Sequence, residues 1–249
     1  MKKTTSWGNV ATWYDSLLES RTDTYQHAVI LPNLARNLEI QKGEKILDLA
    51  CGQGFFARVL EKRGARVNGV DISLDLITLA KKHSSRNIDF FKSKAESMPM
   101  FEDGRFQKVV CILALQNIED IDKTFREVSR VLKPKGSLYI VLNHPAFRIW
   151  KASSWERDKE NNYYRRIDKY LSGSKEVITM HPGKDPRIKT ISFNRPLQAY
   201  IKALRKNGFL IRSLEEWISH KKSEGKHARE ENRIRKEIPL FLFLEAIKH

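Results

Sequence analysis

One carboxylate stands inside an apolar run that ends in a glycine-rich turn. The run is Ile46-Leu-Asp-Leu-Ala-Cys-Gly-Gln-Gly-Phe-Phe56, and Asp48 is its one charged residue. Burying an unpaired carboxylate costs free energy, so Asp48 in a predicted strand indicates a ligand with positive charge. Asp71 ends a second short strand, nineteen residues after Gly52, where an acid can hold two ribose hydroxyls. These residues predict a nucleotide-type cofactor at the ends of neighbouring strands.

The turn is compatible with two cofactors. Gly52-Gln-Gly-Phe-Phe-Ala57 matches the spacing by which dinucleotide-binding proteins bring the backbone close to a pyrophosphate. Asp48 disfavours a dinucleotide, because a carboxylate four residues before the first glycine would face an anion. S-adenosylmethionine has no phosphate and carries an ammonium at its methionine end, so we expect this cofactor. On these residues alone, an α/β protein with an ordinary glycine-rich turn remains an alternative.

These side chains need a sheet whose strands end at one edge. The predicted strands are 45–50, 66–70, 87–92, 106–115, 137–142, 209–214 and 240–247, and the predicted helices are 55–63, 74–83, 122–132 and 197–207. Strands alternating with amphipathic helices are typical of a doubly wound, parallel α/β sheet.

Five segments in this order resemble a known family. They are Leu47-Asp-Leu-Ala-Cys-Gly-Gln-Gly54, Gly69-Val-Asp-Ile-Ser73, Lys94-Ala-Glu-Ser-Met-Pro99, Leu113-Ala-Leu-Gln-Asn-Ile-Glu-Asp120 and Val128-Ser-Arg-Val-Leu-Lys-Pro-Lys-Gly136. The chain resembles class I S-adenosylmethionine-dependent methyltransferases of the type 11 group, closely over about residues 42–142. The resemblance implies a Rossmann-like, mostly parallel sheet of seven strands in the order 3-2-1-4-5-7-6, with the last strand antiparallel. Cofactor and acceptor would then meet at the carboxyl ends of the strands.

The resemblance assigns contacts at the methionyl and ribose parts of the cofactor. Asp48 and the backbone at Gly52 and Gly54 are expected at the methionyl end. Asp71 is expected at the ribose hydroxyls, and Ile72 on the adenine.

The adenine side departs from the family pattern. Lys94 stands where the family commonly has an acid that reaches the adenine amino group, so we expect the Ala95 backbone and Glu96 to take that part. Glu96 is equally compatible with a solvated turn. Leu113 is expected beside the sulfonium, and Tyr14 over the cofactor. The predicted cofactor-binding residues are Tyr14, Asp48, Ala50, Gly52, Gly54, Asp71, Ile72, Ala95, Glu96 and Leu113.

Methyl transfer from a sulfonium needs alignment and exclusion of water more than acid–base chemistry. A base is needed where the acceptor keeps its proton at neutral pH. His144 follows the fifth predicted strand, and an ordinary histidine pKa of about 6.5 suits proton abstraction; a histidine that caps the strand end is the alternative. His181 is a second candidate, with a solvated loop residue as its alternative. Gln116 and Asn117 stand where the family often has two histidines, so neither can act as a base.

Residues 143–195 interrupt the regular pattern and are rich in Trp, Tyr and Arg. We expect them to form a cap over the acceptor, with aromatic rings that either stack on a planar acceptor or form a small core of their own. Residues 1–40 are expected to form N-terminal lid helices, and residues 41–249 the cofactor-binding domain. The predicted substrate-binding residues are Asn117, Asn143, His144, Arg148, Trp155 and His181.

The chain carries 46 basic and 30 acidic residues, a net charge of +16. Residues 144–249 hold 24 basic and 13 acidic residues (+11), and residues 1–143 hold 22 and 17 (+5). A surplus of this size can bind nucleic acid or reflect a lysine-rich composition without a partner. The charged stretch 219–237 is likewise either a phosphate-backbone contact or a solvated helix.

Two cysteines, Cys51 and Cys111, lie in strand or turn contexts, which indicates a reducing compartment. The first residues do not read as a signal peptide, and no apolar window has the length of a membrane span. We therefore expect a cytoplasmic monomer or homodimer, with no membrane partner and no metal.

Three functions are compatible with the sequence. We favour a methyltransferase acting on an O, N or C nucleophile of a small molecule, because an aromatic cap suits such an acceptor. A tRNA or rRNA methyltransferase would use the basic C-terminal half, but Gln116-Asn-Ile-Glu119 stands where an Asn-Pro-Pro-aromatic motif would be expected. A non-catalytic S-adenosylmethionine sensor would need the same Asp48 and Asp71.

Overall fold

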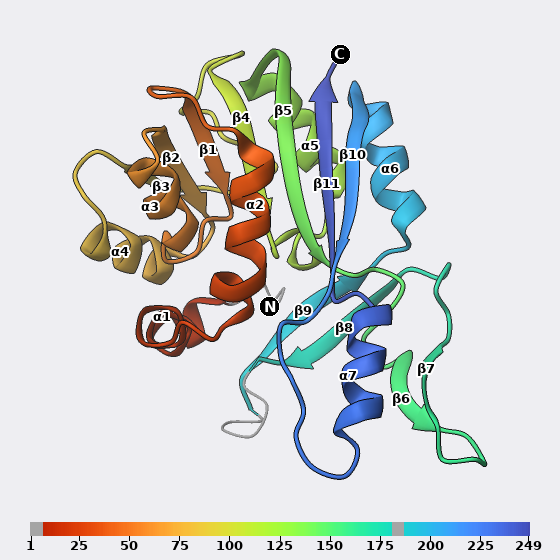
Figure 1. Ribbon diagram of the computed structural model, residues 1–249. Coiled ribbons are helices and arrows are strands. Elements are labelled where there is room, and N and C mark those ends of the chain that lie inside the picture. Colours follow the sequence, from red (N-terminus) through yellow and green to blue (C-terminus); the bar gives the residue numbers. More distant parts are fainter. Residues whose placement is uncertain (1–6, 181–186) are drawn as a thin grey trace.

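The computed structural model describes residues 7–180 and 187–249. Seven strands form a central sheet (Figure 1). They are β1 (Lys45–Leu49), β2 (Arg66–Asp71), β3 (Asp89–Lys92), β4 (Phe106–Ile112), β5 (Leu132–Asn143), β10 (Phe209–Trp217) and β11 (Phe241–Lys248). Their order is β10-β11-β5-β4-β1-β2-β3; β11 is antiparallel to both neighbours, and the other pairs are parallel. Because β10 and β11 are the sixth and seventh expected strands, the predicted order 3-2-1-4-5-7-6 is confirmed.

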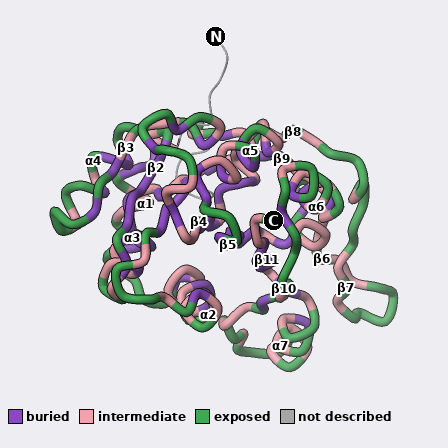
Figure 2. The backbone as a smooth tube through the Cα atoms, turned by 90° about the horizontal axis from the view of Figure 1, so that it is seen from above, coloured by how far each residue is buried: buried purple, intermediate pink, exposed green. Residues whose placement is uncertain are grey.

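Helices cover both faces of this sheet. They are α1 (Ala11–Ser20), α2 (Leu31–Leu38), α3 (Phe55–Lys62), α4 (Leu74–His83), α5 (Ile121–Val131), α6 (Leu197–Lys206) and α7 (Ala228–Glu237). Successive side chains of a strand point to opposite faces, so Ile46 joins an apolar cluster with α2, α3 and α4, and Leu47 joins one with α5 and α6. Figure 2 shows β2 and β4 as mostly buried and β10, at the edge of the sheet, as largely exposed. The prediction of a doubly wound α/β sheet is confirmed.

The fifth strand begins earlier than the sequence predicts. It was expected over Ser137–Leu142, but β5 starts at Leu132, directly after α5. The register against β4 shifts near the start of β5, where residues 133–136 interrupt the ladder. Gly136 fits this irregularity because an added Cβ would lie 2.9 Å from the carbonyl oxygen of Gln107.

The N-terminal residues form helices beside the carboxyl ends of the strands. A 3-10 helix (Trp7–Val10) precedes α1, and a π-helical turn (Gln26–Ile30) precedes α2. Asp15 of α1 lies 3.0 Å from the imidazole of His83 in α4. Glu19 of α1 forms an ion pair with Arg58 of α3. Two contacts thus fasten α1 to the sheet-covering helices. No helix within residues 7–180 and 187–249 has the length and hydrophobicity to cross a membrane.

The segment 143–195 is more regular than the sequence predicts, because it contains two antiparallel hairpins. β6 (Ser153–Arg157) pairs with β7 (Tyr163–Ile167), and β8 (Ser174–Thr179) pairs with β9 (Lys189–Asn194). Both hairpins are separate from the main sheet, and α7 lies beside β7. The sequence conceals these strands because they mix polar and apolar residues instead of presenting buried runs.

Two hydrogen bonds close the base of this insertion. The Trp150 backbone N–H donates to the side-chain oxygen of Asn194 at 3.2 Å, and the Asn194 side-chain amide donates to the Trp150 carbonyl at 3.3 Å. The residues that enter and leave the hairpins are therefore held together at one neck.

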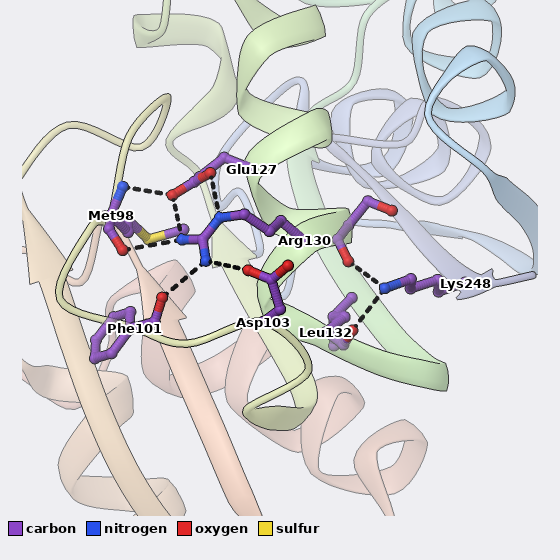
Figure 3. Close-up of polar contacts among 8 residues, drawn as sticks. Met98, Phe101, Asp103, Glu127, Arg130, Leu132 and Lys248 are labelled. Carbon is purple, nitrogen blue, oxygen red and sulfur yellow. Dashed lines mark hydrogen bonds and ion pairs between the residues drawn. The ribbon is translucent and has the colours of Figure 1, made fainter.

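Arg130 of α5 binds the loop that follows β3 (Figure 3). Its guanidinium donates to the carbonyl oxygens of Met98 (3.1 Å) and Phe101 (2.8 Å) and to the carboxylates of Asp103 (2.7 Å) and Glu127 (2.7 Å). Glu127 in turn accepts from the Met98 backbone N–H at 2.6 Å. This network fixes the loop that leads from β3 to β4.

Replacing Arg130 by alanine should lower the free energy of unfolding by about 2 kcal/mol, because two loop carbonyls and Glu127 lose a charged donor. Urea denaturation followed by circular dichroism measures this change. Arg126→Ala is the matched control, since it removes only an exposed pair with Asp122 and should cost about 0.5 kcal/mol or less. Equal midpoints for the two variants would contradict the role given to Arg130.

Candidate functional site

A cavity of about 330 Å³ opens at the carboxyl ends of β1, β2 and β4, and is called here the strand-end cavity. It is lined by Trp7, Tyr14, Gln26, Ala50, Gly52, Asp71, Ile72, Leu76, Ile112, Leu113, Ala114, Gln116, Asn117, Ile118, Asn143, Trp150, Ile178, Thr179, Met180, Thr190 and Ser192. The N-terminal helices, the sheet and the β8–β9 hairpin therefore share one space. A second cavity of about 510 Å³ adjoins it across Asp71 and Ile72, and contains Ala95 and Glu96.

The structure brings most of the predicted cofactor residues to these two cavities. Tyr14, Ala50, Gly52, Asp71, Ile72 and Leu113 line the strand-end cavity, and Ala95 and Glu96 line the second. Asp48 borders a smaller space beneath, together with Tyr14 and Gly52.

Gly54, also predicted at the methionyl end, is not among the residues that line these three spaces. It begins α3 with a φ of +80°, and an added Cβ would lie 2.9 Å from the Phe90 ring. The second glycine of the turn thus allows close packing of the helix on the sheet. Gly52, in contrast, faces the Tyr14 ring, with 3.6 Å between its added Cβ and Cε1.

Asp48 is buried and lacks a hydrogen-bond partner at one oxygen. The Ala57 backbone stabilises its charged form, but Oδ2 has no partner among the described residues. Burial, followed by repulsion from Asp71, raises the pKa of Asp48 to about 7. The site therefore contains an uncompensated carboxylate that a cationic group would stabilise.

Asp71 connects the two strand ends that carry the site. Its Oδ2 accepts from the Gly52 backbone N–H at 3.0 Å, and its Oδ1 accepts from the Ser73 N–H at 2.8 Å. Burial raises the pKa of Asp71, against the opposing effect of these hydrogen bonds. One carboxylate thus joins the glycine turn after β1 to the residues after β2.

Two non-glycine residues of the cavity have left-handed backbone conformations. Ala50 follows β1 with a φ of +57°, and Leu113 follows β4 with a φ of +54°. Such values are uncommon for residues with a Cβ and tend to occur at functional sites. They turn the chain sharply at the end of two central strands, where the cavity begins.

The N-terminal helices close one side of the strand-end cavity. The Tyr14 ring meets the Trp7 ring edge to face, with 5.4 Å between the centroids. Burial raises the pKa of Tyr14 to about 12, and Gln26 hydrogen-bonds its hydroxyl. Tyr14 is therefore a neutral, half-buried wall of the cavity.

His144 caps the end of β5 through hydrogen bonds. This is the structural alternative to a catalytic role that the sequence analysis gave for it. Its Nε2 lies 2.7 Å from a carboxylate oxygen of Glu216, and its Nδ1 accepts from the backbone N–H groups of Ala146 and Phe147. Both ring nitrogens are occupied, His144 does not line the strand-end cavity, and burial lowers its pKa. This geometry argues against the predicted role of His144 as a base.

The remaining predicted substrate residues lie in two places. Asn117 and Asn143 line the strand-end cavity. Arg148 and Trp155 line a neighbouring pocket of about 270 Å³, called here the cap pocket. His181 lies outside the described residues.

Several cavity residues escaped the sequence-based list of site residues. Thr190 and Ser192 reach the cavity together because alternate residues of β9 share a face. Gln116 contributes a buried side-chain oxygen, and Thr190 a buried hydroxyl, that have no partner among the described residues. The β8–β9 hairpin determines which residues of β9 face the cavity. Predicting this hairpin from the sequence would therefore have identified Thr190 and Ser192.

The comparisons with known proteins agree on one kind of domain. A family model described as a methyltransferase domain matches residues 47–140. The demethylmenaquinone methyltransferase of Chlorobaculum tepidum is 38% identical over 136 residues, 53% of this chain and 55% of that protein. The ubiquinone biosynthesis O-methyltransferase of Xanthomonas oryzae pv. oryzae is 30% identical over 101 residues, 39% of this chain and 42% of that protein. The chain thus spans about half the length, or less, of these curated relatives.

A solved structure extends the similarity beyond the matched segment. The S-adenosylmethionine-dependent methyltransferase from Mesorhizobium loti superposes with a TM-score of 0.74 at 25% identity. This superposition covers 90% of this chain and 100% of that chain. The shared fold therefore includes the regions on both sides of residues 47–140.

Replacing Asp48 by asparagine should make the cofactor-free protein more stable at high pH. Because its folded pKa is about 7, above the ordinary value of 3.8, the folded protein binds a proton that the unfolded chain releases as pH rises. Stability is then lost as pH rises toward 7, and Asp48→Asn removes this loss. The gain relative to wild type should grow by roughly 2–3 kcal/mol between pH 5 and pH 8, measured by chemical denaturation. Parallel pH profiles for the two proteins would rule the raised pKa out; Asp89→Asn, an exposed carboxylate, is the control.

Proposed function

We propose, from the premise that the chain contains a class I S-adenosylmethionine-dependent methyltransferase domain of the type 11 group, that it transfers a methyl group to a small-molecule acceptor. The observation that carries this proposal is the unpaired, buried oxygen of Asp48 beside a roofed cavity at the strand ends. An uncompensated carboxylate there suits a cofactor with a cationic amino-acid end.

The residues at the strand ends fit S-adenosylmethionine, the cofactor of this domain. Asp48 would pair with the ammonium, and Asp71, whose carboxylate is already oriented by two backbone N–H groups, would hold the ribose hydroxyls. Ile72 would pack on the adenine in the second cavity, with Ala95 and Glu96 at its edge. When bound, the cofactor supplies a methyl group already activated on a sulfonium.

The protein's remaining task is to position the acceptor and exclude water. Tyr14 and Trp7 cover one side of the strand-end cavity, and Trp150 lies at the boundary with the cap pocket. Gln116 and Thr190 present unpartnered polar atoms that would orient the acceptor. The nucleophile would be an O, N or C atom, and His144 is not assigned to deprotonate it, since both its ring nitrogens are engaged.

Two relatives support a small acceptor, because their names place them in the methylation of demethylmenaquinone and in ubiquinone biosynthesis. The basic surplus of residues 144–249 instead favours RNA as a second candidate. The element that would contact RNA is α7. Its residues are mostly charged, and Ile234 is the one buried residue of this helix. The strand-end cavity, with a volume of about 330 Å³, is of a size that suits a small acceptor.

Asp71→Ala should weaken S-adenosylmethionine binding about ten- to hundred-fold, because charge-assisted hydrogen bonds to the ribose are lost. Titration calorimetry measures the affinity, and a thermal melt checks that the variant remains folded. Asp89→Ala, an exposed carboxylate at the opposite end of the sheet, is the matched control and should bind normally. An affinity for Asp71→Ala equal to that of wild type would remove Asp71 from the cofactor site.

Incubation with methyl-labelled S-adenosylmethionine should place the label in a small-molecule extract and not in total RNA. The two fractions are tested separately, with Asp48→Ala protein as the control that lacks the cofactor carboxylate. Label that appears only in the RNA fraction would reverse the ranking of the two acceptors. Label in neither fraction, with S-adenosylmethionine bound, would favour the sensor function.

A further inference from the structure

The cap pocket adjoins the strand-end cavity on its cap side. The two spaces share Asn143 and Trp150 as walls. The cap pocket is also lined by Phe147, Arg148, Lys151, Ser153, Trp155 and Arg165. A molecule whose reacting atom lies in the strand-end cavity could therefore extend into this pocket.

The cap pocket carries positive charge without acidic lining residues. None of its lining residues in the described parts of the chain is a carboxylate. Lys151 is neutralised by Glu176, at 2.7 Å. Arg165 donates to neutral oxygens, the Phe147 carbonyl and the Ser153 hydroxyl, the latter at 2.6 Å.

Arg148 is the least satisfied of these cations. Within residues 7–180 and 187–249 its side chain has no hydrogen bond and no ion pair, and it interacts electrostatically with the Tyr25 phenol and with Arg165. Although Arg148 is accessible to solvent, the concave surroundings desolvate it and lower its pKa. Burial and, after it, the positive charge of Arg148 lower the pKa of Arg165. Two guanidinium groups without a counter-charge are stabilised when an anion binds between them.

The form of the pocket suits one small anionic group beside an aromatic ring. Arginine binds carboxylate and phosphate oxygens through two parallel N–H donors, which gives both affinity and orientation. Trp150 and Trp155 supply flat apolar walls, and the Arg165 guanidinium lies 5.2 Å from the Trp155 ring centroid. A pocket of about 270 Å³ is of a size that suits a single small group.

We propose that the methyl acceptor carries a carboxylate or phosphate group, and that Arg148 and Arg165 bind this group in the cap pocket. This inference rests on the proposed function, since it specifies the acceptor of the same site. The anion would fix one end of the acceptor, and the atom to be methylated would reach past Asn143 and Trp150 into the strand-end cavity. Arg148 is thus a specificity-determining residue.

Benzoate, phenyl phosphate and neutral benzamide are suitable probes, because they share a ring and differ in charge. Each is titrated into the protein with S-adenosylhomocysteine present, and binding is followed by tryptophan fluorescence and by calorimetry. Benzoate or phenyl phosphate should bind at least about ten-fold more tightly than benzamide, and the better of the two identifies the oxyanion.

Arg148→Gln should weaken binding of the better anion about ten-fold, while Arg148→Lys should recover part of the loss. Arg166→Gln is the matched control, because Arg166 is the next residue after Arg165, points to the opposite face of β7 and pairs with Glu156. It should change the affinity by less than about two-fold.

Equal binding of benzamide and the anions, an unchanged affinity in Arg148→Gln, or no binding of any probe would each overturn the proposal. Displacement of the bound anion by a single-stranded RNA oligonucleotide, with affinity lost in Arg148→Gln, would reassign the pocket to RNA. S-adenosylmethionine affinity is measured on the same samples. A protein that does not bind S-adenosylmethionine would contradict the proposed methyl transfer. Anion binding through Arg148 is measured separately, so the two proposals can fail independently.

Discussion

The burial of one negative charge is the constraint to which the rest of the site conforms. Asp48 lies on a central strand, where the apolar residues around it are needed for the sheet, and one of its oxygens finds no partner among the described residues. The left-handed residues Ala50 and Leu113 turn the chain away from the sheet near this carboxylate and leave space above it. Asp71 fixes the turn by binding the Gly52 N–H, and Tyr14 covers it. The site is thereby shielded from water, and the free-energy cost of burying the Asp48 charge is left for a bound ligand to offset.

The sheet and the cofactor half of the site could be predicted because they depend on local signals. Apolar runs mark buried strands, and an acid at the end of such a run is conspicuous whatever the distant residues do. Gly54 shows the limit: its spacing matches that of a cofactor turn, but the sequence does not reveal that the Phe90 ring also packs against this glycine. His144 shows the same limit, because its partner Glu216 is 72 residues away in the chain and only the folded structure brings them together.

The acceptor half was less predictable because its walls come from hairpins with weak patterns. Thr190 and Ser192 acquire a common direction only once β9 pairs with β8. The structure also locates the basic surplus of the C-terminal residues. Part of it is neutralised in surface pairs such as Lys151 with Glu176, whereas Arg148 has no ion pair among the described residues. Net charge alone does not distinguish these two situations, since it counts residues and not their partners.

The closed neck of the insertion has a consequence for how such a protein can diversify. The hairpins leave the scaffold after β5 and return just before α6, and Trp150 and Asn194 hold those two points together. The described residues of the intervening segment form sheets of their own and share no ladder with the seven strands. Substitutions within this segment can therefore change the residues that face the acceptor while the hydrogen-bond ladders of the seven strands stay intact. Trp150 is the exception, because it belongs both to the neck and to the boundary between the two spaces.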